Sequence, residues 1–120
     1  MKVKIGNCDY NIIETKDKYN ETFWNKEANE LKLYGQCDSV NGIITIWSEL
    51  PEDRKRRTLK HELTHAFLNV YWESFNIKER YDNEDVCCFM ETFADEILRI
   101  TNEYFLERSS RFIDKIKRSD

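Results

Sequence analysis

The sequence predicts a small α+β domain in which an N-terminal antiparallel sheet packs on long helices. β-branched and aromatic residues alternate with turn signals through the first fifty residues. From Glu52 onward, apolar residues recur at helical spacing in two long stretches. The 120 residues include only one proline and three glycines, which favours long helices over a many-stranded β protein. A chain of this length is expected to form one domain, spanning residues 1–120.

Two hairpins are predicted in the N-terminal part. The first joins Val3 and Ile5 to residues 10–13 through a turn near Gly6. The second joins residues 33–38 to residues 43–47, where the pair Asn41-Gly42 is typical of a type I′ turn. The mostly polar residues 17–34 are expected to form a short helix or an irregular segment.

Two long helices are predicted after the hairpins. The first runs from Glu52 to about Phe75, with Pro51 in its first turn, and is apolar nearly all round, which is typical of a buried helix. The second runs from about Glu84 to beyond Tyr104 and is capped by Asp82 or Asn83. Its apolar stripe is expected to be core; its members are Val86, Phe89, Met90, Phe93, Ala94, Ile97, Ile100, Thr101 and Tyr104. Residues 112–116 either continue this helix or form a short separate one.

The composition excludes several classes of protein. A net charge of −4 and a pI near 5.3 argue against general binding to nucleic acid. No apolar run is long enough to span a membrane, and the start lacks the apolar segment of a signal peptide. We therefore expect a cytoplasmic protein with no membrane partner, whose four cysteines remain thiols. The oligomeric state does not follow from the sequence.

The two histidines of the chain carry the clearest functional signal. They stand in the run His61-Glu62-Leu63-Thr64-His65, four residues apart. Residues i and i+4 share one face of a helix, so two imidazoles at this spacing can bind one zinc ion. Glu62 lies about 100° around the helix from His61, which suits a base that acts on a water molecule at the metal.

A catalytic zinc ion usually has a third protein ligand. Glu91 is the favoured candidate, because a carboxylate at the border of an apolar stripe needs a partner. Asp95, one turn later, is an alternative ligand or a group that orients a histidine ring. Cys87 and Cys88 are further alternatives, since thiolates bind zinc well.

The stretch from residue 33 to residue 100 resembles the ImmA/IrrE-like metallopeptidases of bacteria, phages and mobile elements. The resemblance rests on the strand 43–46, the basic start of the following helix at residues 54–59, the run His61–His65 and residues 91–95, which look like the family's E-x-x-A-N pattern. It implies a zincin-like fold with His61, His65 and Glu91 as Zn²⁺ ligands and Glu62 as general base. Family members cleave specific repressor proteins.

The expected function is that of a zinc-dependent endopeptidase acting on a specific protein or peptide, in which zinc and Glu62 activate water. The alternative is a zinc-stabilised binding module, an inhibitor or adaptor without catalysis, with a closed site that uses Cys87 or Cys88. If the strand 43–47 is an open edge, a substrate could pair with it. Candidate oxyanion donors are Tyr34, Tyr71 and Tyr81.

The basic run 54–57 with Lys60 is open to two interpretations. It forms either a solvated face, balanced by Glu49, Glu52 and Asp53, or a patch that binds an acidic partner.

Overall fold

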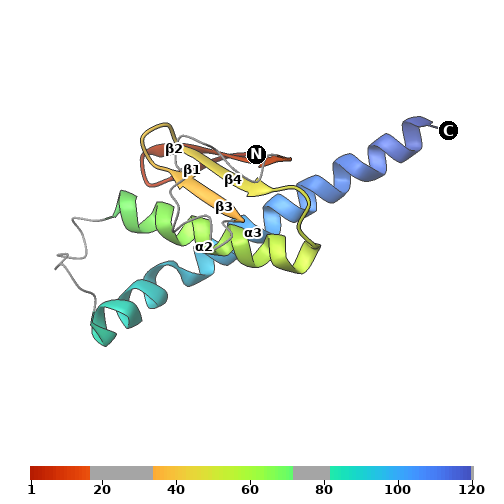
Figure 1. Cartoon of the computed structure of the whole chain (residues 1–120). Helices are drawn as coiled ribbons and strands as arrows, with labels where there is room; N and C mark the ends of the chain where they lie inside the picture. The colour runs from red at the N-terminus through yellow and green to blue at the C-terminus, as the bar shows by residue number, and fades with distance from the viewer. Residues whose placement is uncertain (17–33, 72–81, 120) are drawn as a thin grey trace.

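The computed structural model describes residues 1–16, 34–71 and 82–119, and it confirms the α+β class (Figure 1). The elements are β1 (Lys2–Ile5), β2 (Cys8–Thr15), β3 (Gly35–Asp38), β4 (Ile43–Trp47), α2 (Glu52–Val70) and α3 (Asn83–Ser119). The short helix or irregular segment expected at residues 17–34 falls almost wholly outside the described residues, as does Tyr81.

The four strands form one mixed sheet in the order β1-β2-β4-β3. Both predicted hairpins are present, since β1 pairs with β2 and β3 pairs with β4, each antiparallel. The central pair is parallel, with Asn11 opposite Ile43 and Thr15 opposite Trp47, so the expectation of a wholly antiparallel sheet was wrong at this junction. A parallel pair needs a long connection, and residues 16–42 supply it.

The position of β4 corrects a second expectation. This strand lies between β2 and β3, so both of its edges are paired and it cannot be an open edge. Among the described strands, β3 forms the outer edge on this side of the sheet.

The loop between β3 and β4 has four residues rather than a two-residue turn. The side chain of Asp38 accepts hydrogen bonds from the backbone N–H groups of Val40 and Asn41. Gly42 adopts a φ of 66°, and its carbonyl accepts the N–H of Asn11. This contact fastens the second hairpin to β2.

Both long helices form where the sequence predicts them. Pro51 occupies the position just before α2, and the helix ends at Val70, with Tyr71 as its C-cap, rather than at about Phe75. Asp82 caps α3, because its carboxylate accepts the N–H of Asp85 while Asp85 accepts the N–H of Asp82. α3 is one continuous helix of 37 residues, so residues 112–116 continue it, and its last turns project beyond the sheet (Figure 1).

The core lies between the sheet and the two helices. Leu59, Leu63 and Ala66 of α2 are fully buried, and α3 buries Ile97, Ile100 and Thr101. Around the contact between the helices, the rings of Phe67 and Phe93 lie 5.3 Å apart. Val86 and Met90, expected in the core, are about half exposed at the start of α3.

A buried ionic cluster ties the sheet to both helices. Lys55 of α2 is only 4% exposed, and its Nζ lies 2.8 Å from Oε1 of Glu14 on β2. Oε2 of the same carboxylate accepts a hydrogen bond from the hydroxyl of Tyr104 at 2.6 Å and forms an ion pair with Nε of Arg108 at 2.9 Å. The interpretation of the basic run as a solvated face is therefore wrong at Lys55, which faces inward.

No helix in the described part of the chain is long and apolar enough to cross a membrane.

Candidate metal centre

The two histidines of α2 lie side by side on its exposed face. The Nε2 atoms of His61 and His65 are 3.2 Å apart, and the two rings meet at 74°. Two imidazole nitrogens bound to one tetrahedral zinc ion, each at about 2.05 Å, lie about 3.3 Å apart. The nitrogens thus already have the separation that a shared zinc ion requires.

A hydrogen bond between the rings is the other arrangement compatible with this distance. Burial lowers the pKa of His65, and the neighbouring His61 lowers it further. Both effects favour the neutral imidazole, which is the form that binds a metal. With a metal ion bound, each neutral ring would carry its proton on Nδ1, and both Nε2 atoms would be free to face the ion.

Glu62 points from the same helix toward the sheet. It is 7% exposed, and burial raises the pKa of its carboxyl group to about 7. Its neighbour is Gly35 on β3, where a Cβ atom would lie 3.1 Å from Cγ of Glu62 and 2.6 Å from Cγ2 of Thr58. A glycine at the start of β3 therefore lets the edge strand approach α2 closely beside the glutamate.

Cys37 lies on the same edge strand. Burial raises the pKa of its thiol to about 11, and the nearby negative charge of Glu62 adds to this shift. At neutral pH this cysteine is a thiol, which is a poor metal ligand.

The structure brings His61 and His65, two of the four predicted site residues, close together, and Glu62 is adjacent in sequence. Glu91 is exposed on α3. It stands two residues after Phe89 and two before Phe93, so its side chain leaves the helix about 160° away from these core-facing rings. Asp95, Cys87 and Cys88 are exposed as well. Within the described residues, no group of three His, Cys, Asp or Glu side chains is arranged to hold a metal ion. The third ligand thus remains a prediction.

The predicted oxyanion donors have other contacts. The ring of Tyr34 stacks on Trp47 at 6.3 Å and lies 5.5 Å from the guanidinium carbon of Arg54. The ring of Tyr71 stacks on that of Phe93 at 4.6 Å. These contacts assign both rings a packing role.

Comparison with known protein families decides the assignment of the chain. Residues 13–118 match the peptidase family described as the IrrE N-terminal-like domain. The chain belongs to this family. No curated protein and no solved structure gives a match.

Membership in the IrrE-like family identifies a metallopeptidase-like domain, and the match includes β4, α2 and the run from His61 to His65. Gly35 and the edge position of β3 are features of the candidate site that sequence reasoning missed. A lone glycine at the start of a strand was the one available signal, since it often marks a close approach of another backbone or side chain.

Proposed function

We propose that this chain is a zinc-dependent endopeptidase that hydrolyses a peptide bond in a specific protein substrate, for which the family resemblance suggests a transcriptional repressor as one candidate. The observation that carries the proposal is the 3.2 Å separation of the two histidine Nε2 atoms, on a helix within the region that matches a peptidase family. Zinc suits this pair because it binds imidazole at tetrahedral geometry and leaves a position for water.

The residues of α2 would divide the chemistry between them. Zinc, when bound, supplies Lewis acidity toward water and toward the scissile carbonyl. His61 and His65 would hold the ion, and their ring orientation is set by their position on a well-packed helix. Glu62, the residue after the first ligand, would accept a proton from water and deliver it to the departing amine.

The edge strand β3 would align the substrate. An extended peptide can add to a sheet edge through backbone hydrogen bonds, and β3 is the outer described strand beside the histidine-bearing helix. Gly35 and Glu62 are in close contact, so a peptide paired with β3 would pass near the glutamate and the histidine pair. The sequence predicts this role for residues 43–47, but both edges of β4 are paired, so we propose it for β3.

The direct test of catalysis is Glu62→Gln. This variant is expected to fold and to bind about as much zinc as the wild type, because neither histidine changes. We expect its hydrolysis of peptides to fall by at least about a hundredfold, since general base catalysis contributes factors of about 10²–10⁴. Zinc content by elemental analysis and peptide cleavage by mass spectrometry give the two readouts. Retained cleavage would contradict the role of Glu62.

Glu91 is proposed as the third ligand, and its replacement tests the kind of site. Glu91→Ala is expected to weaken zinc binding about 10-fold or more, whereas Asp95→Ala and the double variant Cys87→Ala/Cys88→Ala leave it within about threefold of wild type. Competition with a fluorescent zinc chelator measures each affinity. Loss of zinc with the double cysteine variant would instead indicate a closed site and a binding module without catalysis. Loss with Asp95→Ala alone would move the third ligand by one turn.

A further inference from the structure

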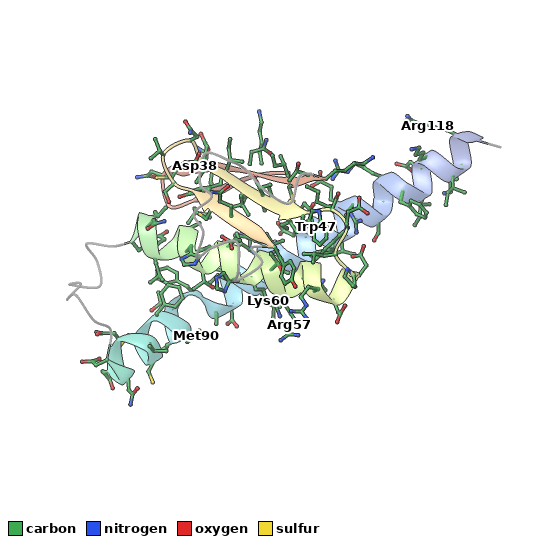
Figure 2. The ribbon with its side chains drawn as sticks, in the orientation of Figure 1. Asp38, Trp47, Arg57, Lys60, Met90 and Arg118 are labelled. Atoms are coloured by element: carbon green, nitrogen blue, oxygen red, sulfur yellow. The ribbon has the colours of Figure 1, made fainter. Side chains whose placement is uncertain are left out.

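Two arginines share the histidine face of α2. Arg54 and Arg57 precede His61 by seven and four residues, so their side chains leave the helix within about 20° and about 40° of its direction. Both arginines are exposed. Figure 2 shows Arg57 on the side of α2 that faces away from the sheet, so it lies across the histidine face from β3.

The other cations of this run have different positions. Lys55 is buried against Glu14, and Arg56 donates a hydrogen bond to Asn102 of α3. Lys60 is exposed, but its side chain leaves α2 about 100° from that of His61. Arg54 and Arg57 are therefore the two cations that border the candidate site.

The acidic residues nearest this face do not neutralise the two arginines. Glu52 is bound by Arg108, and no ion pair joins Glu49 to either arginine among the described residues. Asp53 stands one turn before Arg57, yet no ion pair joins them in the part of the chain that the structure describes. The whole chain carries a net charge of −4, so this local positive patch runs against the overall charge.

Helix α2 and strand β3 run in the same direction. Gly35, at the start of β3, faces Thr58 and Glu62, while Asn69, near the end of α2, donates a hydrogen bond to Ser39 just after β3. A peptide that pairs antiparallel with β3 would run from the Ser39 end toward the Gly35 end. It would pass the histidine pair first and the arginines afterwards.

The spacing along the helix sets which substrate residues meet the arginines. At 1.5 Å per residue, Arg57 lies about 6 Å and Arg54 about 10 Å before His61 along the axis. A strand advances about 3.3 Å per residue, so these distances correspond to about two to three substrate residues. Guanidinium groups bind carboxylates through paired hydrogen bonds.

We propose that Arg57 and Arg54 select substrates with aspartate or glutamate two to three residues C-terminal to the cleaved bond. The inference rests on the proposed function, because it places the cleaved bond at the histidine pair. The substrate would be an acidic segment along the edge of β3, with Arg57 on the side away from the sheet and Arg54 over Tyr34, beside the start of β3.

The test is a cleavage-site profile on a library of tryptic peptides, with zinc-loaded wild type, Arg57→Gln, Arg54→Gln and Lys60→Gln. We expect Asp and Glu to be enriched at the second and third positions after the cut, and each arginine variant to lose about two- to fivefold in cleavage of acidic sites. Lys60→Gln removes the same charge and is the matched control, with an unchanged profile. Enrichment before the cut, no enrichment, or an equal effect of Lys60→Gln overturns the proposal and leaves the peptidase function standing.

A binding measurement separates failure of the inference from failure of the proposed function. Two fluorescent decapeptides of identical composition, with three glutamates in either the C-terminal or the N-terminal half, are titrated with zinc-loaded Glu62→Gln. Tighter binding of the first peptide, lost on adding Arg57→Gln and weakened by 0.5 M salt, supports the acidic-segment site even where the wild type cleaves nothing. Absence of both cleavage and this binding difference overturns the proposal together with the peptidase function.

Discussion

Metal-free Glu62→Gln is expected to be more stable than the metal-free wild type at pH 8, by about 3 kcal/mol, with almost no difference at pH 4. Burial raises the pKa of the Glu62 carboxyl group from its ordinary 4.5 to about 7. The carboxyl group therefore keeps its proton up to a higher pH in the folded chain than in the unfolded chain. Its favourable contribution is complete below about pH 4.5 and is lost as the pH rises to 7. Glutamine, which stays neutral, avoids that loss.

Urea unfolding of chelator-treated protein at pH 4, 6 and 8 measures this difference. Glu91→Gln is the matched control, because it makes the same chemical change on an exposed face of α3. We expect its unfolding free energy to follow the wild type within about 0.5 kcal/mol at each pH. If the unfolding free energies of the wild type and of Glu62→Gln changed equally with pH, the carboxyl group of Glu62 would not be desolvated in the folded chain.

Lys55→Met is expected to destabilise the protein by about 3 kcal/mol, because it leaves the half-buried carboxylate of Glu14 without its closest cation. Arg108 and the hydroxyl of Tyr104 continue to contact Glu14, which keeps the cost near the lower end for a broken buried pair. The double variant Glu14→Gln/Lys55→Met removes both charges and is expected to recover at least about 1 kcal/mol.

Chemical denaturation at pH 7 measures these differences, and Lys60→Met, which changes an exposed lysine on the same helix, controls for loss of charge. A Lys55→Met variant as stable as Lys60→Met would contradict the role of the cluster. Burial alone would raise the pKa of Glu14, but hydrogen bonds from Lys55 and Tyr104 and the charges of Lys55 and Arg108 lower it overall. This contribution to stability is present above the ordinary pKa and is lost as the pH falls through the lowered one. Lys55→Met is therefore expected to lose less stability on acidification than the wild type.

Local signals in the sequence were enough to predict the hairpins, the helices and the histidine pair. Gly6 and Gly42 mark turns, Asp82 caps α3, and the spacing of His61 and His65 places both rings on one face of α2. Each of these features depends on residues within a few positions of one another. The predicted type I′ turn is replaced by a four-residue loop, because Asp38 accepts two backbone N–H groups and closes that loop.

Features that depend on distant residues could not be predicted in the same way. The parallel pairing places Asn11 opposite Ile43, and neither strand carries a sign of it in its own residues. Nothing in the sequence around Lys55 distinguishes it from its basic neighbours. Its burial follows from its contact with Glu14, 2.8 Å away on a distant strand. The third ligand depends on how α3 is rotated about its axis. That rotation is set by the packing of Phe89 and Phe93, and the apolar spacing of α3 defines it only to within a broad stripe.

Titration of chelator-treated protein with zinc, measured by isothermal titration calorimetry, tests most directly the central claim that His61 and His65 bind a metal ion. The account predicts that the wild type binds about one zinc ion per chain and that His65→Ala, a change at an exposed side chain, folds but binds at least about a hundredfold more weakly. Lys60→Ala, on the same helix, should bind zinc as the wild type does. A wild-type chain that takes up no zinc, or a His65→Ala variant that binds it equally well, would contradict the assignment of His61 and His65 as a metal-binding pair.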